Sequence, residues 1–216
     1  MNRAVLLFVA LSSVGTVSAA CAGNAISDSS GAGGPAKGGA GSGSGGQAGS
    51  APAQGNLTIS VQPPSTGAAT CPVLGKTYVL GNPKGPNSVQ PGDRLIDGEQ
   101  GAIIQCSVHG TGPYTFFGTL SGVTSELEQL TLGITDGVVD AQKQTGTATM
   151  VVNTPSLAGS FASPVGGCTI SVIAQNVRPG SLWATASCPT ITDPSTGKVC
   201  AVGAMTTFVL ENCDGS

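Results

Sequence analysis

Short runs of alternating apolar and polar residues recur along the chain from about residue 56 onward. The alternation is clearest in residues 58–61 (TISV) and 130–134 (LTLGI). A period of two places successive side chains on opposite faces of a β-strand, and helical periodicity is nearly absent. The runs are rich in Val, Ile and Thr and are separated by Gly, Pro, Asn and Asp. They predict strands at 56–62, 76–80, 102–109, 114–120, 126–134, 145–153, 157–162, 168–175, 181–188 and 205–212.

Residues 56–216 are therefore expected to form one all-β domain, an antiparallel β-sandwich or partly open barrel of about 8–10 short strands. Residues 176–180 (NVRPG) are typical of a turn, so the flanking strands are expected to form a hairpin. Trp183, the only tryptophan, lies on this hairpin. We expect it in the core, with an exposed binding aromatic as the alternative.

Residues 1–20 have the pattern of an export signal. Arg3 supplies a positive charge, residues 4–11 (AVLLFVAL) are apolar, and residues 18–20 (SAA) offer small side chains for cleavage. The apolar run is shorter than the roughly 20 residues of a transmembrane helix. Residues 17–21 (VSAAC) resemble a bacterial lipobox, which implies that Cys21 is the first mature residue and carries acyl chains. Plain cleavage at the same place is the alternative, because Ser18 stands where Leu is usual.

Glycine, serine and alanine dominate residues 22–55. This segment contains 12 glycines and no aromatic residue. It cannot bury enough apolar surface to offset the entropy of ordering. We therefore expect residues 21–55 to comprise the lipid-anchor cysteine and a disordered linker with a root-mean-square reach of about 30 Å.

Six further cysteines lie in the predicted domain, an even number that suits three disulfides in a protein outside the cytoplasm. We expect Cys71 to pair with Cys106. For the other four, one solution joins Cys188 to Cys200 and Cys168 to Cys213, and the alternative joins Cys168 to Cys188 and Cys200 to Cys213. We favour the first, because directly opposed cross-strand bridges demand a particular strand spacing.

Few residues have the spacing of a chemical site. Asp93, Asp97 and Glu99 share a turn-rich segment and make a weak calcium candidate, with a solvated loop as the alternative. A glycosidase-type carboxylate pair is formally possible, with Asp93, Asp97, Glu99, Glu126 and Glu128 as candidates. Glu126 and Glu128 share a strand face by alternation, although a solvated strand edge is the simpler interpretation. No catalytic residue, no resident metal and no cofactor is expected.

His109 is the only histidine, which disfavours both a zinc site with Cys106 and a serine- or cysteine-hydrolase triad. Residues 70–77 (TCPVLGKT) end like a phosphate-binding loop but lack its leading glycine. Loss of Arg3 leaves 7 basic against 11 acidic residues with no basic cluster, so nucleic acid is not an expected partner.

The signal, Cys21 and the linker together resemble uncharacterised lipoproteins of bacterial envelopes of the myxobacterial type. The resemblance extends loosely to residues 168–172, 179–183, 187–189, 200 and 208–213. It implies a location at the outer membrane or cell surface, with soluble secretion as the alternative, and it implies no particular reaction.

The expected function is that of a non-enzymatic, surface-tethered module that binds an envelope component, a carbohydrate or a protein. The alternatives are a carboxylate-dependent secreted hydrolase and a passive structural envelope protein. The expected partners are a membrane, through the lipid anchor, and an envelope protein or glycan.

Overall fold

The computed structural model describes residues 51–66, 70–82 and 93–215. The predicted export signal, Cys21 and the linker up to residue 50 lie outside the described residues. The linker was expected to end at residue 55, but the first strand already begins at Gln54. The boundary is therefore slightly earlier than predicted, because Gln54 and Gly55 pair with Glu211 and Leu210 of the last strand.

The described residues form eleven strands and one short 3₁₀ helix, which confirms the all-β prediction. The strands are β1 (Gln54–Gln62), β2 (Lys76–Leu80), β3 (Leu95–Ile96), β4 (Ile103–Gly110), β5 (Tyr114–Val123), β6 (Gln129–Asp140), β7 (Thr145–Thr154), β8 (Gly159–Ala162), β9 (Cys168–Arg178), β10 (Ser181–Thr192) and β11 (Val199–Glu211). The helix, η1 (Pro155–Leu157), lies between β7 and β8.

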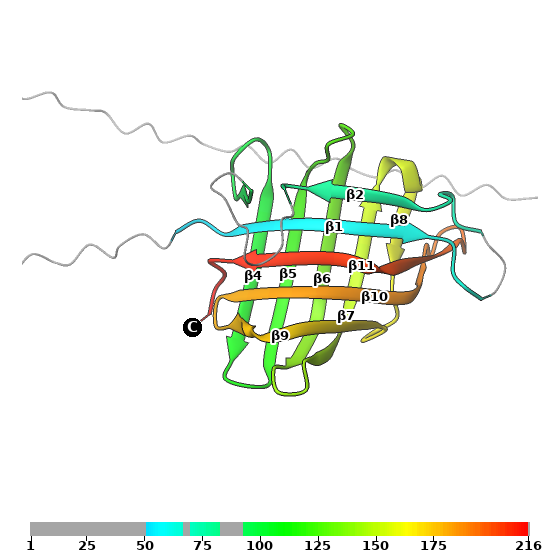
Figure 1. Ribbon diagram of the computed structural model, residues 1–216. Coiled ribbons are helices and arrows are strands. Elements are labelled where there is room, and N and C mark those ends of the chain that lie inside the picture. Colours follow the sequence, from blue (N-terminus) through cyan, green and yellow to red (C-terminus); the bar gives the residue numbers. More distant parts are fainter. Residues whose placement is uncertain (1–50, 67–69, 83–92, 216) are drawn as a thin grey trace, which may run out of the picture. The chain divides into compact units, whose positions relative to one another are not determined.

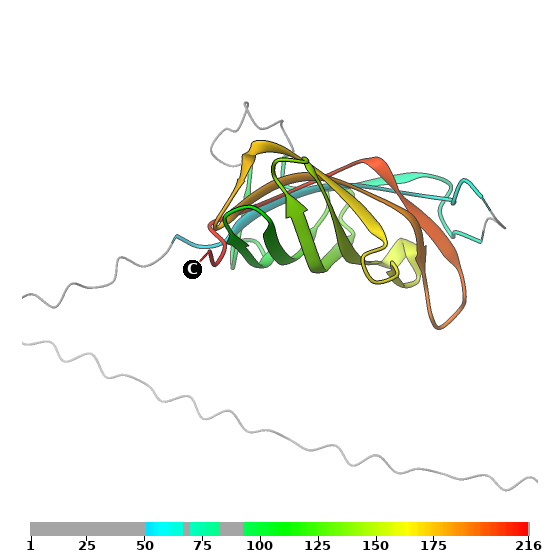
Figure 2. The ribbon, with the colours of Figure 1, turned by 90° about the horizontal axis from the view of Figure 1, so that it is seen from below.

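All paired strands are antiparallel and belong to one sheet with the order β2-β1-β11-β10-β8-β7-β6-β5-β4. The strand β9 pairs with both β10 and β7, and β3 pairs with β1. Figure 1 shows the result as two layers: β2, β1, β11, β10 and β9 run across the front, and β4 to β8 cross behind them at a steep angle. The view in Figure 2 shows how strongly the long strands curve. The predicted sandwich is thus made by a single sheet that folds over on itself.

The core lies between the two layers and follows the period-two pattern. Leu130, Leu132 and Ile134 of β6 are buried, whereas the residues between them face outward. Phe116 and Phe208 come from opposite layers and pack with their ring centroids 6.3 Å apart. Burying each such side chain contributes roughly 1.5–3 kcal/mol.

Three disulfides join the six domain cysteines: Cys71–Cys200, Cys106–Cys213 and Cys168–Cys188. They indicate a protein that folds outside the reducing cytoplasm.

The favoured pairing was wrong in all three bonds, and of the alternative only Cys168–Cys188 is correct. These two cysteines oppose each other on β9 and β10 with a Cα separation of 4.2 Å, close to the narrow pair spacing of an antiparallel ladder. The other two bonds follow the topology of the sheet. The segment between β1 and β2 meets the start of β11, and the residues after β11 cross to β4.

Candidate functional site

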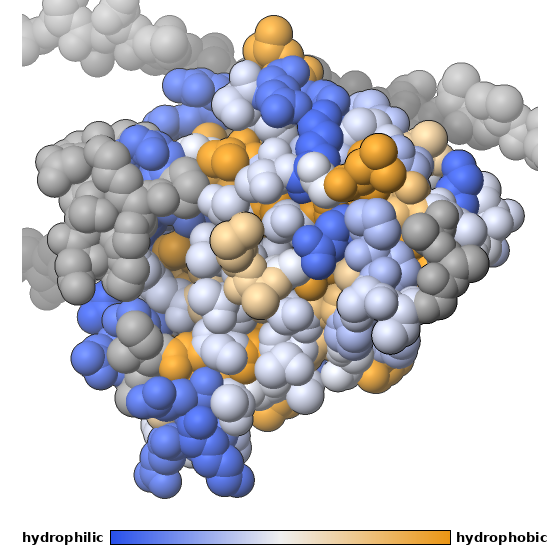
Figure 3. Space-filling model, turned by 45° about the vertical axis from the view of Figure 1, so that its right-hand side comes forward, coloured by the Kyte–Doolittle hydropathy of each residue, from blue (hydrophilic) through white to orange (hydrophobic). Residues whose placement is uncertain are grey.

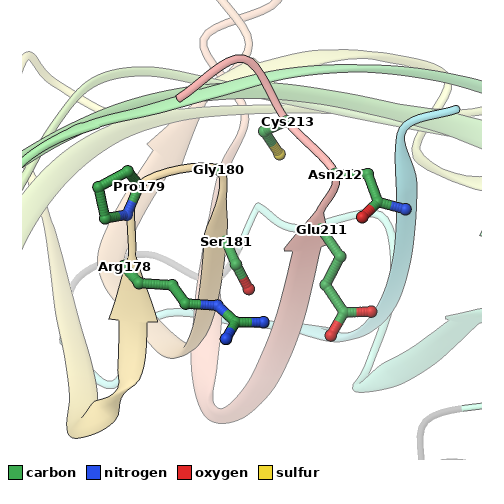
Figure 4. A pocket seen from close by; sticks show the side chains of 7 residues that line it. All are labelled: Arg178, Pro179, Gly180, Ser181, Glu211, Asn212 and Cys213. Atoms are coloured by element: carbon green, nitrogen blue, oxygen red, sulfur yellow. The ribbon is translucent and has the colours of Figure 1, made fainter. Parts of the chain in front are cut away.

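An open pocket of about 560 Å³ lies where the β9–β10 turn meets the end of β11. Its lining residues are Arg178, Pro179, Gly180, Ser181, Glu211, Asn212 and Cys213. Figure 4 shows the side chains of Arg178, Ser181 and Glu211 extending to the same side, with the guanidinium and the carboxylate pointing toward one another. The volume is within the range of small-ligand sites, and the lining is mostly polar.

A tight turn builds one wall of this pocket. The register pairs Arg178 with Ser181, so that only Pro179 and Gly180 connect the strands. Proline followed by glycine with a φ of 76° suits a type II turn, which is shorter than the five-residue turn expected from the sequence. The Gly180 N–H donates to the Val108 carbonyl of β4, which fixes the turn against the second layer.

The residues after β11 pack directly against this turn, where the Cys213 N–H donates to the Gly180 carbonyl at 3.0 Å. Asn212 adopts a φ of 53°, and the chain then leaves the sheet toward β4. The Asp214 N–H donates to the Cys106 carbonyl, the Val108 N–H donates to the Asp214 carbonyl, and the Cys106–Cys213 disulfide lies beside these bonds. The edge of β4 is therefore covered here, which protects it from pairing with another chain.

A charged network supports the floor of the pocket. The two carboxylate oxygens of Glu211 accept hydrogen bonds from Arg94 Nε and Trp183 Nε1, both at 2.9 Å. The Arg94 guanidinium also stacks over the Trp183 ring, 4.5 Å from its centroid. Arg94 is only 8% exposed, and its Nη1 and Nη2 atoms have no hydrogen-bond partner within the part of the chain that the structure describes. Glu211 is thus held in place with its charge balanced by Arg94.

Trp183 is not in the core, contrary to the favoured expectation. It alternates with the buried Leu182 and Ala184 on β10 and so lies half-buried on the outer face of the front layer, beneath Arg94. The ring is not exposed as the alternative expected either, because Arg94 covers it. The tryptophan supports the pocket through Glu211 but is not among the lining residues.

Arg178 differs from the other pocket residues because its charge is not balanced. It is exposed, and it makes no ion pair with any residue that the structure describes. The pocket therefore presents one free guanidinium beside a neutralised carboxylate.

A second polar cluster joins β2, the β5–β6 turn and η1. Lys76 Nζ lies 2.6 Å from Glu128 Oε1 and 3.0 Å from Glu126 Oε2. Glu128 Oε2 also accepts hydrogen bonds from Thr154 and Ser156. These hydrogen bonds, that from Lys76 above all, lower the pKa of Glu128, and the two carboxylates raise the pKa of Lys76.

The two predicted carboxylates therefore do converge, because both bind the same lysine, as a carboxylate-dependent hydrolase would require. A general acid needs a raised pKa, however, and the pKa of Glu128 is lowered. Lys76 also pairs with both carboxylates. This cluster has the chemistry of an ion-pair network that links elements.

The calcium candidates are not brought together. The Asp97 carboxylate accepts the Ile104 N–H at 2.8 Å, and Asp93 accepts a hydrogen bond from the Asn82 side chain at 2.9 Å. Glu99 lies in the turn between β3 and β4. Among the described residues no three His, Cys, Asp or Glu side chains are grouped to hold a metal ion. Cys106 is in a disulfide, so its thiolate is not available for a zinc site with His109.

Several large apolar side chains are exposed among the described residues. On the face shown in Figure 3 they form separate groups between polar ones. The large exposed examples are Leu74, Ile103, Phe117, Val123, Leu127, Val138, Val165 and Met205.

Comparisons with known proteins find no match: no family model, no curated protein and no solved structure matches the chain. Within the described residues, no helix is both long and apolar enough to cross a bilayer. The sequence had indicated only a turn where the pocket lies. Its lining residues come from segments about 30 positions apart, and the one local signal is an arginine next to Pro-Gly.

Proposed function

We propose that the mature protein is a non-enzymatic binding module, held at the cell envelope by a lipid on Cys21, that captures an envelope glycan in the pocket between Arg178 and Glu211. The observation that carries this proposal is the pocket itself, which combines an unpaired guanidinium with hydroxyl, amide and carboxylate groups. Such a set recognises a polar, hydroxyl-rich ligand by hydrogen bonding.

The position of the pocket supports a tethered function. The Asn212 side chain lines the pocket and donates a hydrogen bond to the Pro52 carbonyl at 3.2 Å. The segment that leads back to Cys21 therefore joins the domain next to the pocket. The pocket and the attachment point of the tether would then lie at the same end of the domain.

A capture experiment tests this function. Full-length protein purified with its lipid and disulfides intact is incubated with envelope extract, and bound glycan is quantified for the wild type, Arg178→Glu and Lys198→Glu. Lys198 is a matched control, because it is the other described cation without an ion pair and lies outside the pocket. We expect Arg178→Glu to lose at least 90% of the captured glycan and Lys198→Glu to retain it. Equal capture by all three proteins would refute a function of the pocket.

A further inference from the structure

We infer that the ligand of the Arg178–Glu211 pocket is an acidic saccharide, with its carboxylate on Arg178 and its hydroxyls on Glu211, Ser181 and Asn212. This inference rests on the proposed function and names its ligand class. It depends on the charge balance of the pocket and on the donor and acceptor groups that remain open there.

The charge balance requires an anion. Of the five basic residues that the structure describes, Lys76, Arg94 and Lys143 each pair with a carboxylate. Arg178 and Lys198 do not, and only Arg178 lines the pocket. A planar guanidinium matches a carboxylate with two parallel hydrogen bonds, which adds direction to the attraction.

A single negative charge fits better than a double one. Glu211 lies across the pocket from Arg178, and its own charge is balanced by Arg94. The pocket therefore presents about one net positive charge. A phosphate monoester carries close to two negative charges at pH 7, and the second would face Glu211. A carboxylate leaves no such excess.

The remaining groups suit hydroxyls. A carboxylate has about four acceptor positions, and Arg94 and Trp183 occupy two of those on Glu211. Sugar hydroxyls can donate to the other two. The Asn212 amide N–H₂ donates to Pro52, which leaves its Oδ1 as an acceptor, and Ser181 supplies a hydroxyl. Trp183 and Arg94 hold Glu211, and the Cys106–Cys213 disulfide holds Cys213, so binding has to order chiefly the exposed Arg178 side chain.

Isothermal titration calorimetry on the mature, disulfide-bonded protein tests the inference with three probes. Tetragalacturonate carries carboxylates, its fully methyl-esterified form keeps the hydroxyls without the charge, and a hexose 6-phosphate supplies the phosphate. We expect the acid to bind at least tenfold more tightly than the ester and more tightly than the phosphate. In Arg178→Gln the acid and ester should bind equally, Arg178→Lys should be intermediate, and Lys198→Gln should behave as the wild type.

Unfolding midpoints of the variants provide the folding control, and Arg178 is exposed, so we expect them to be unchanged. The inference is overturned if neither tetragalacturonate nor its ester binds, if they bind equally to the wild type, if the phosphate binds best, or if Arg178→Gln keeps the preference. Should the titration fail while envelope capture still depends on Arg178, only the ligand class is wrong. Should capture also be independent of Arg178, the proposed function fails with it.

Discussion

Gly180 meets two constraints that each impose a cost on any residue with a Cβ. Its φ of 76° is in the left-handed region, which costs an L-residue about 1–2 kcal/mol. A Cβ there would also lie 3.1 Å from the Cys213 carbonyl oxygen. The glycine therefore permits both the turn and the close approach of the residues after β11.

Substitution of Gly180 by alanine tests this account against a matched control. Gly197 has a φ of 69° and nothing within 4 Å of an added Cβ, so Gly197→Ala carries only the backbone cost. We expect a loss of about 1 kcal/mol for Gly197→Ala and a larger loss for Gly180→Ala in urea unfolding. Equal losses would show that the contact with Cys213 has no energetic effect.

At the scale of elements, the alternation predicted nearly every strand, because the inward positions must be apolar wherever two sheet layers enclose a core. The strand expected at 126–134 was wrong at its start: β6 begins at Gln129. Residues 124–128 instead form a turn in which Leu127 has a φ of 62° and is 86% exposed. The alternation of Glu126, Leu127 and Glu128 has the period of a strand although these residues form a turn. The two acids instead pair with Lys76, a contact between segments that are distant in the sequence.

The network around Glu128 predicts a dependence of stability on pH. Its pKa is lowered from the ordinary value of 4.5, so the folded state favours the ionised form. The resulting stabilisation is present above pH 4.5 and is lost as the pH falls through the folded-state pKa. We expect Glu128→Gln to be less stable than the wild type at pH 7 and the difference to shrink towards pH 3, as measured by urea unfolding at each pH.

Glu126→Gln provides the comparison, because Glu126 is more exposed and makes one ion pair with the same lysine. Its effect on unfolding should be small, as for exposed ion pairs in general. The difference in unfolding free energy between Glu128→Gln and the wild type should narrow in acid. If it does not, the stabilisation does not come from the Glu128 charge.

At the scale of the whole molecule, local sequence patterns do not predict which distant segments come into contact. The β1 and β11 strands are neighbours although they stand at opposite ends of the domain sequence, so proximity along the chain misled the assignment of Cys71 and Cys213. The pocket could not be predicted for the same reason, since Arg178 meets Glu211 only after the sheet has folded over. Residue types indicated the compartment, but pairing and site geometry depend on contacts between distant segments.

The anchor is also a property of the whole chain. If Cys21 is lipidated, metabolic labelling with a palmitate analogue should mark the wild type, and Cys21→Ala should show no label. The labelled protein should partition with membranes and the variant should not. Equal labelling of both proteins would refute the anchor, while the capture experiment on the pocket would be unaffected.

The Cys106–Cys213 bond closes a loop of 107 residues and contributes one residue directly to the pocket wall. Chain made in a reducing compartment would leave the end of β11 held to β4 by backbone hydrogen bonds alone. If the pocket binds an acidic saccharide as we propose, the reduced protein should bind it more weakly than the oxidised protein, so that oxidation would act as a maturation step for recognition.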